Sequence, residues 1–347
     1  LQWTGGNLVP GTNRRVTFEA NQRGITIAPG SYGYSAPVDL NVVKGADNRD
    51  LLGRKLAVSF HVAGSSGPMT WHSTALTTSY LSAPGAGTHG EDASDRAFPF
   101  STTSWFFLDA VDVMAPEDTI VVAALGDSIT NGSLSTLNGD DRWPDVLAYR
   151  LHAEHGARVS VVNAAIGGNQ VLGPAVYKMD DPYFGGPSAL QRLDRDVLSL
   201  SGLKAVVWLE GINDFGLAVP SPSAEAVIAG LREGIDRMRA RGIKVIGGTL
   251  TTTVNGGTPA HGTPETDAKR RTVNQFIRTG GVYDGVADFD GVTLDPATGM
   301  LQPAFIPGST TGGPGDRIHP NRAGYQAMGY AIDLKLFART GQERPAR

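Results

Sequence analysis

Two hydrophobic patterns follow one another along this chain and change near residue 118. Before that point, short segments of alternating apolar and polar residues are separated by Gly, Pro, Ser and Asn turns, and no helical period is sustained. The segments expected as strands are 15–19, 24–27, 56–62 and 105–111. This pattern predicts a small β-sandwich or jelly-roll-like domain over residues 1–117.

From residue 118 to 347, continuous apolar runs alternate with segments of helical period, which is typical of an α/β domain built on a parallel sheet. Strands are expected at 120–125, 158–163, 205–209, 244–249 and 286–288. Helices are expected at 143–154, 224–241, 265–279 and 321–339. Asp141 should cap the first helix and Gly242 should end the second, while Thr263 and Pro264 should begin the third.

Length and composition limit the classes of function. A chain of 347 residues is expected to form two domains. Its formal net charge of −4, without a basic block, argues against nucleic acid as a partner. No apolar run is long enough to cross a membrane, so no membrane partner is expected. The absence of cysteine excludes disulfides, thiolate metal sites and a cysteine nucleophile.

Four polar clusters fall at the ends of expected strands or in the loops beyond them. The first three follow strands, and the fourth precedes the last helix. In chain order they are 126–130 (GDSIT), 163–169 (NAAIGGN), 210–214 (EGIND) and 316–321 (DRIHPN). Because the carboxyl ends of parallel strands emerge at one edge of a sheet, the first three clusters should converge there.

These clusters contain the groups that acyl transfer requires: a nucleophile, a base, a group that orients the base, and donors for an oxyanion. Ser128 supplies a hydroxyl, His319 an imidazole, and Asp316 a carboxylate three residues before it. The backbone N–H groups of Ser128 and Gly168 and the side chain of Asn213 supply donors. Taken alone, Gly-Asp-Ser is equally well an ordinary strand-to-helix turn with Asp or Ser at the N-cap.

The ordered set of clusters resembles the SGNH (GDSL) hydrolase superfamily, whose four blocks carry Ser, Gly, Asn and His. The matching residues are Ser128 in GDSIT, Gly168 in NAAIGGN, Asn213 in GIND and His319 in DRIHPN. The matches look closest to bacterial xylanase-associated arylesterases and acylhydrolases. The resemblance implies a flavodoxin-like three-layer sheet, with Asp316 completing a catalytic triad and the Ser, Gly and Asn forming an oxyanion hole. Thr130 replaces the second glycine of the G-x-S-x-G elbow, which argues against an ordinary α/β-hydrolase.

Five further residues are expected to support the site or to line its pocket. Asp127 should hydrogen-bond the turn that carries the serine, and Asn169 should support the glycine block. Trp143 and Phe215 are either walls of an acyl or sugar pocket or ordinary core aromatics. His72 either reaches the edge of the site or packs structurally.

Another histidine, His261, lies in a loop rich in Gly and Pro. It either borders the site or belongs to a surface loop, and the surface loop is the favoured interpretation.

The sequence predicts a serine esterase that acts through an acyl-enzyme. The resemblance implies short acyl groups, above all acetyl, on plant-type carbohydrate. A general short-chain aryl or lipid esterase is one alternative, and a non-catalytic carbohydrate-binding protein with a vestigial triad is another. No cofactor and no metal are expected, and the expected partners are small-molecule or polysaccharide esters. The family tendency and the first residue, Leu1 instead of Met, predict a processed protein that is secreted or periplasmic, and the oligomeric state stays open.

Overall fold

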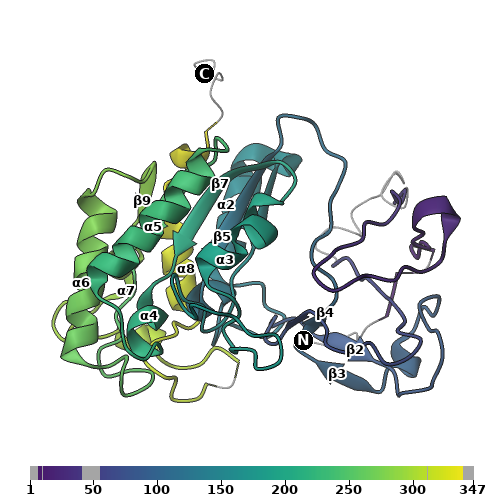
Figure 1. Ribbon diagram of the computed structural model, residues 1–347, viewed down its shortest axis with the longest axis horizontal. Coiled ribbons are helices and arrows are strands. Elements are labelled where there is room, and N and C mark those ends of the chain that lie inside the picture. Colours follow the sequence, from purple (N-terminus) through teal and green to yellow (C-terminus); the bar gives the residue numbers. More distant parts are fainter. Residues whose placement is uncertain (1–6, 10, 41–54, 311, 339–347) are drawn as a thin grey trace. The chain divides into compact units, whose positions relative to one another are not determined.

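The computed structural model describes residues 7–9, 11–40, 55–310 and 312–338 (Figure 1). The chain divides into two compact units. The first unit comprises Leu1–Trp71 and Thr78–Phe107, and the second comprises His72–Thr77 and Leu108–Arg347. A division into domains at residues 117 and 118 stays a prediction.

The second unit is built on a five-stranded parallel sheet. Its strands are β5 (Ile120–Gly126), β6 (Val159–Asn163), β7 (Leu203–Leu209), β8 (Lys244–Gly248) and β9 (Gly285–Ala287). They lie in the order β6-β5-β7-β8-β9, and every neighbouring pair is parallel. Counted within this unit, the order is that of flavodoxin-like sheets. The predicted α/β fold with a parallel, flavodoxin-like sheet is confirmed.

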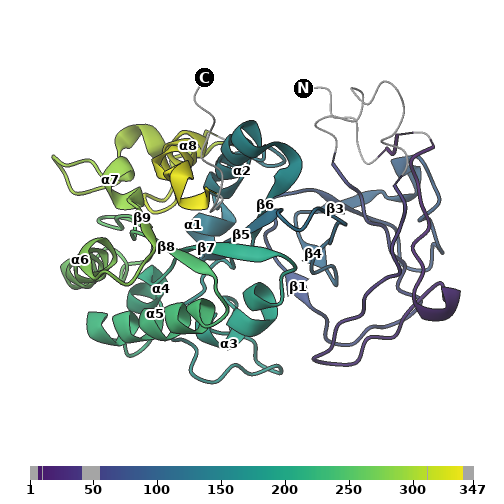
Figure 2. The same ribbon diagram turned by 90° about the horizontal axis from the view of Figure 1, so that it is seen from above.

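Helices cover both faces of this sheet and complete three layers. The α-helices are α1 (Ser128–Asn131), α2 (Trp143–His155), α3 (Ala189–Leu193), α4 (Ile212–Gly216), α5 (Ala224–Arg239), α6 (Pro264–Thr279), α7 (Phe289–Thr293) and α8 (Arg322–Ala331). Shorter helical turns are η1 (Glu19–Asn21), η4 (Asp95–Ala97), η5 (Gly156–Arg158), η6 (Asp194–Leu198), η7 (Pro303–Phe305) and η8 (Leu334–Phe337). Figure 2 shows α2 and α8 on one side of the sheet and α3 and α5 on the other.

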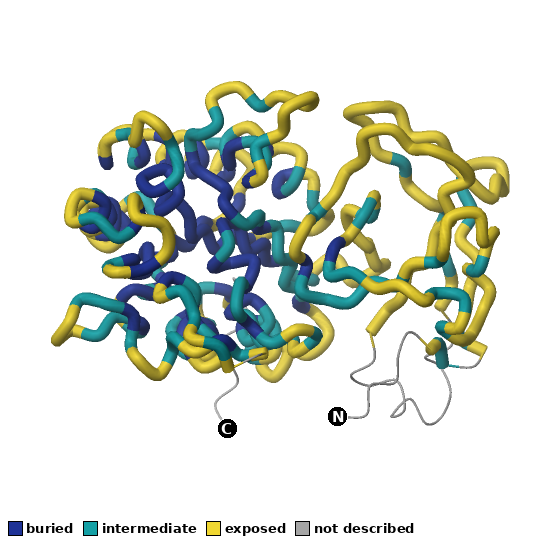
Figure 3. Tube along the Cα trace, turned by 90° about the horizontal axis from the view of Figure 1, so that it is seen from below, coloured by how far each residue is buried: buried dark blue, intermediate teal, exposed yellow. Residues whose placement is uncertain are grey.

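The core of the second unit forms because its central strands are apolar on both faces. In β5, the side chains of Val122 and Leu125 are fully buried. Helix α5 turns a stripe that includes Val227 and Leu231 toward the sheet, and both residues are buried. Figure 3 shows the buried residues concentrated in this sheet and on the inner sides of its helices. Burial of this apolar surface is the main stabilising contribution to the fold that positions the site.

The helix ends agree with the sequence patterns in one case and differ in another. Pro264 is the first residue of α6, and the Thr263 side chain at the N-cap accepts a hydrogen bond from the Thr266 N–H, as predicted. At α2 the prediction is wrong, because Arg142 occupies the N-cap. Asp141 accepts a hydrogen bond from a backbone N–H of the preceding loop instead.

The last helix is shorter than the predicted segment 321–339. Helix α8 ends at Ala331, and the side chain of Asp333 accepts a hydrogen bond from the Lys335 N–H. The chain therefore continues as the separate turn η8, because an aspartate at this position caps a new turn instead of continuing the old one.

The N-terminal part of the chain has short strands in place of the longer predicted ones. They are β1 (Trp71–His72), β2 (Ser79–Leu81), β3 (Phe100–Thr102) and β4 (Trp105–Phe106). β2 and β3 pair in antiparallel fashion, and β1 neighbours β4.

Three of the four segments predicted as strands in this part form none; they are 15–19, 24–27 and 56–62. In the last of them, the alternating apolar side chains stay 41–59% exposed. Among the described residues of the first unit, only Ser104 is buried. Alternation favours a strand when one face packs on a core, and the described residues of this unit form no core over that face.

Candidate active site

The strand order of the sheet reverses at β5 and β7. The chain passes from β5 to β6 on one side and then returns to β7 on the other side of β5. At such a switch point the loops that follow the two strands diverge and leave room for a ligand beyond the carboxyl ends. Ser128 follows β5 and Asn213 follows β7, so the fold places both at this point.

Ser128 is the first residue of α1, directly after the central strand. Asp127 occupies the N-cap, and its Oδ1 accepts a hydrogen bond from the Ile129 N–H at 2.9 Å. Gly126 permits a close approach to the next strand, because a Cβ there would lie 2.3 Å from the carbonyl oxygen of Leu209. This strand-to-helix turn leaves Ser128 half-buried at the carboxyl edge of the sheet.

His319, in the loop before α8, meets Ser128 although 191 positions separate them in the sequence. Its Nε2 lies 2.7 Å from the Oγ of Ser128, and its Nδ1 lies 2.5 Å from the Oδ2 of Asp316. The His319 side chain is 20% exposed. The structure therefore brings together the three residues that the sequence predicts as a triad, at a place that solvent reaches.

The hydrogen bonds of Asp316 determine which imidazole nitrogen carries the proton. Its Oδ1 accepts hydrogen bonds from the N–H groups of Ile318 and His319, at 3.0 and 2.9 Å. Burial raises the pKa of Asp316, but the hydrogen bonds and the charge of His319 outweigh burial and lower that pKa to about 2. An ionised carboxylate only accepts, so Nδ1 carries the proton and Nε2 accepts from the serine hydroxyl.

The glycine block lies against the same turn. A Cβ on Gly167 would lie 3.8 Å from the Cβ of Ser128, so the two backbones are neighbours. Gly168 has a φ of +81°, and a Cβ there would lie 2.2 Å from the ring of Phe184. The left-handed backbone conformation favours glycine at this position, and the Phe184 ring lies against it.

Asn169 ties the loops of the site together. Its side chain is fully buried, and its Nδ2 donates to the carbonyl oxygens of Gly185 and Pro187, both at 2.7 Å. Its Oδ1 accepts from the Nε of Arg192 at 2.8 Å. Its backbone carbonyl accepts from the Nδ2 of Asn213 at 3.0 Å. Because an amide has two N–H groups, one N–H of Asn213 stays available for a ligand.

Three carboxyl groups are buried beside these loops. Burial raises the pKa of Asp127 to about 8 and that of Asp214 to about 7, and it also raises the pKa of Glu210. Asp214 accepts hydrogen bonds from the N–H groups of Val171 and Leu172, so it braces the loop after β6. Asp127 holds its proton at neutral pH and acts on the turn through Oδ1, so it does not serve as a second base.

Trp143 and Phe215 lie in the hydrophobic core. They are 0% and 2% exposed, and the ring of Trp143 packs 5.2 Å from the ring of Phe289, centroid to centroid. Of the two interpretations that the sequence left open, the structure favours the core position over the pocket wall. Side chains that are buried to this extent offer a substrate almost no surface, so we assign neither of them to a pocket.

His72 packs structurally. Its Nε2 lies 2.9 Å from the Oδ1 of Asn131, and the Nδ2 of Asn131 donates to the carbonyl oxygen of Thr74 at 2.9 Å. Because Asn131 is the last residue of α1, His72 supports the short helix that begins with Ser128.

His261, predicted to lie in a surface loop, is buried against the site. His261 is 5% exposed, and its Nε2 lies 3.2 Å from the Oδ1 of Asn213. The two residues are 48 positions apart. The only signal in the sequence is a histidine in a loop that follows β8, a strand whose carboxyl end points to the same edge.

Residues 124–327 match the sequence profile of the GDSL-like Lipase/Acylhydrolase family. The match spans more than half of the chain and contains all four polar clusters. The chain belongs to this family. The SGNH (GDSL) resemblance drawn from the four clusters is thereby confirmed, and every distance given above for the triad joins residues inside the matched GDSL segment.

Several solved structures resemble this GDSL family member at low identity. A carbohydrate acetylesterase from Sinorhizobium meliloti is 16% identical, with a TM-score of 0.46 over 63% of this chain and 99% of that chain. An aryl esterase from M. smegmatis is 18% identical, with a TM-score of 0.45 over 61% and 96%. A GDSL-like lipase from Bacteroides thetaiotaomicron is 17% identical, with a TM-score of 0.45 over 64% and 88%. A search of curated proteins gave no match.

Two properties of the described residues bear on membranes and metal ions. Among their helices, none has both the length and the apolar character that crossing a membrane requires. These residues also include no group of three or more His, Asp or Glu side chains arranged to hold a metal ion.

Proposed function

We propose that this GDSL family member is a serine esterase, with Ser128 as nucleophile, His319 as base and Asp316 as the group that orients the imidazole. The observation that carries the proposal is the 2.7 Å contact between Ser128 Oγ and His319 Nε2, continued at 2.5 Å to Asp316. A serine hydroxyl is a weak nucleophile until a base takes its proton. His319 is the proposed base, and its neutral tautomer with the proton on Nδ1 leaves Nε2 free to accept the proton of Ser128.

In the first half of the reaction, Ser128 Oγ attacks the carbonyl carbon of the ester while its proton passes to His319 Nε2. The imidazole becomes a cation, and the ionised carboxylate of Asp316 stabilises that cation through Nδ1–H. The tetrahedral intermediate collapses, the bond to the alcohol oxygen breaks, and the alcohol leaves with the proton from Nε2. The acyl group is then bound to Ser128.

In the second half, water repeats the same step. His319 takes a proton from the water, whose oxygen attacks the acyl carbon, and the proton then returns to the Ser128 oxygen as the acid leaves. The overall reaction consumes the ester and one water and releases the alcohol and the acid, and the serine and the imidazole end as they began.

Three N–H groups are proposed to stabilise the oxyanion of both intermediates: the backbone groups of Ser128 and Gly168 and the second amide N–H of Asn213. The left-handed backbone of Gly168 and the fixed position of the Asn213 amide support this assignment. Donors that are held before the reaction stabilise the developing charge without further reorganisation.

The proposed substrates are short acyl esters, above all acetyl groups on carbohydrate. The family resemblance supports this choice, and so does Phe184, whose ring lies against Gly168 and is 69% exposed. An exposed aromatic face beside the oxyanion donors suits the flat face of a sugar or an aryl ring. Polymeric carbohydrate is met outside the cell, so we place the enzyme there and propose residues 1–117 as its accessory domain.

The proposed function is tested by Ser128→Ala with p-nitrophenyl acetate as substrate. Loss of the nucleophile should lower kcat by on the order of 10⁴-fold or more, while circular dichroism and thermal unfolding match those of the native chain. A folded variant that retains activity would rule out this nucleophile.

A paired assay tests the substrate class. Acetate release from acetylated xylan should exceed butyrate release from tributyrin at equal enzyme concentration. The opposite order would favour a general short-chain esterase. Binding to xylan without hydrolysis of either substrate would favour a carbohydrate-binding protein with a vestigial triad.

A further inference from the structure

His261 is a buried titratable side chain that contacts the proposed oxyanion donor Asn213, and the reaction described above does not use it. Its Nε2 lies 3.2 Å from Asn213 Oδ1, and its Nδ1 lies 2.8 Å from the Oγ1 of Thr258. The ring is buried and bonded on both nitrogens, so it is fixed in position and not free to turn toward solvent.

Three hydrogen bonds link Asn169 to Asn213, Asn213 to His261, and His261 to Thr258. Their directions all follow from one carbonyl group. The backbone oxygen of Asn169 can only accept, so the atom of Asn213 that faces it must be Nδ2. The Oδ1 of Asn213 therefore faces His261, and Nε2 must carry the proton. Nδ1 is then an acceptor, and the hydroxyl of Thr258 donates to it.

The second amide N–H of Asn213 is oriented by this series. A planar amide that accepts at Oδ1 and donates one N–H to a fixed carbonyl cannot rotate without breaking both bonds. Its remaining N–H then points in a fixed direction, which is the requirement for an oxyanion donor.

A glycine in α4 allows the imidazole of His261 to lie close to the helix that carries Asn213. A Cβ on Gly216, the last residue of α4, would lie 2.1 Å from Cδ2 of His261. The ring therefore lies directly on the backbone of the helix that carries Asn213. The backbone of His261 is also held, because its carbonyl oxygen accepts from the Oγ1 of Thr253 at 2.8 Å.

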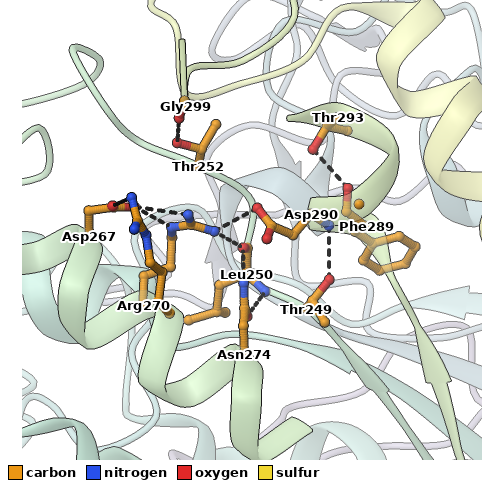
Figure 4. Close-up of polar contacts among 12 residues, drawn as sticks. Thr249, Leu250, Thr252, Asp267, Arg270, Asn274, Phe289, Asp290, Thr293 and Gly299 are labelled. Carbon is orange, nitrogen blue, oxygen red and sulfur yellow. Dashed lines mark hydrogen bonds and ion pairs between the residues drawn. The ribbon is translucent and has the colours of Figure 1, made fainter. Parts of the chain in front are cut away.

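The segment that carries Thr253 is itself fixed by a buried polar network (Figure 4). Arg270 donates to the carbonyl oxygen of Leu250 at 3.0 Å and binds the carboxylates of Asp267 and Asp290. Asn274 donates to the same carbonyl oxygen and accepts from the Leu250 N–H. The loop after β8 is therefore a rigid support for His261.

The protonation of His261 is also constrained. Burial lowers its pKa, and the neighbouring charge of His319 lowers it further. His261 thus stays neutral, and keeps the tautomer that the Asn213 amide requires, while His319 carries the extra proton during the reaction.

We propose that His261 is a positioning residue: through its Nε2–H it holds the Asn213 amide with one N–H directed at the oxyanion. This inference rests on the proposed esterase function and deepens it, because it assigns a role to a residue outside the triad and the oxyanion hole.

The first test compares two variants of His261. His261→Phe keeps a ring of similar shape but removes the donor, and should lower kcat for p-nitrophenyl acetate by about 10- to 100-fold with little change in KM. His261→Gln offers an amide N–H to the same oxygen and should recover most of the loss. A merely structural role predicts no such recovery.

The second test is a double-mutant cycle with Asn213→Ala, in folded variants checked by circular dichroism. If His261 acts through Asn213, then His261→Phe should change kcat by no more than about twofold once Asn213 is alanine. Independent, multiplying losses would overturn the inference, and so would full activity of His261→Phe or of Asn213→Ala alone.

Should His261→Phe fail to fold, Thr258→Val gives the same cycle. It removes the donor to Nδ1, frees the tautomer, and should lower kcat only when Asn213 is present. The Ser128→Ala variant distinguishes failure of the esterase proposal from failure of the His261 proposal. Retained activity of Ser128→Ala would refute the esterase proposal. Its inactivity together with an additive cycle refutes only the role of His261.

Discussion

At the scale of single residues, the geometry of the site depends on two groups that can only accept hydrogen bonds. The ionised carboxylate of Asp316 fixes the proton on Nδ1 of His319, and the carbonyl oxygen of Asn169 fixes the orientation of the Asn213 amide. Ser128 and His319 could be predicted from the sequence because each lies in a short cluster with a supporting aspartate, Asp127 and Asp316 respectively. His261 could not, since its contact with Asn213 depends on how the loop after β8 folds back.

Asp127 provides a prediction at this scale. Burial raises its pKa from 3.8 to about 8, so the folded chain keeps a proton that the unfolded chain releases at lower pH. The contribution of Asp127 to the free energy of unfolding therefore falls as pH rises between these two values. Asp127→Asn keeps an N-cap acceptor and cannot ionise.

The free energy of unfolding of Asp127→Asn should therefore rise relative to that of the native chain as pH rises from 5 to 8. Urea unfolding of both proteins at pH 5 and at pH 8 is the measurement. A difference between the two proteins that does not change with pH would contradict the buried, protonated carboxyl.

At the scale of elements, the five strands and the long helices could be predicted because their apolar periods match what the core requires. The predictions were wrong where a local polar group decided the outcome: Arg142 took the N-cap of α2, and Asp333 ended the predicted last helix early. Three of the four strands predicted in the N-terminal part were wrong for a different reason. Their alternation was real, but the described residues of the first unit form no core over the apolar face.

The packing of α5 against the sheet gives a prediction of its own. A Cβ on Gly234 would lie 2.5 Å from the ring of Trp208, which is buried. Alanine favours a helix by about 1 kcal/mol over glycine, but overpacking a dense core costs about 1–3 kcal/mol. Gly234→Ala should therefore lower the free energy of unfolding.

The matched control on the same helix is Glu233→Ala; the Glu233 side chain is 61% exposed and forms an ion pair with Arg237. Its effect on the free energy of unfolding should stay below about 0.5 kcal/mol. Chemical denaturation of both variants is the measurement, and a Gly234→Ala variant more stable than the native chain would show that the helix does not lie this close to Trp208.

At the scale of the whole molecule, every side chain and backbone group to which the proposed reaction assigns a role lies in the second unit. The sheet order explains how residues so far apart in the sequence meet: the switch point between β5 and β7 is where the loops of the first three clusters open. The sequence clusters indicated this convergence. The fourth cluster, before α8, does not follow a strand of the sheet, so its place beside Ser128 was predicted from the chemistry of its residues and the family resemblance, and not from the strand pattern.

Removal of metal ions tests whether the proposed reaction depends on the groups of the protein alone. Because hydroxyl, imidazole and N–H groups carry all the proposed steps, dialysis against EDTA should leave kcat/KM for p-nitrophenyl acetate unchanged. Loss of activity that a divalent cation restores would contradict this scheme.

The most direct measurement of the central claim is covalent labelling of the nucleophile. A p-nitrophenyl alkylphosphonate reacts with an activated serine and leaves a stable tetrahedral adduct, which peptide mass spectrometry locates. We predict one adduct per chain, on Ser128, that forms in proportion to the loss of esterase activity and is absent from His319→Ala. Complete labelling of Ser128 with activity retained, or activity lost through an adduct on another residue, would contradict the account.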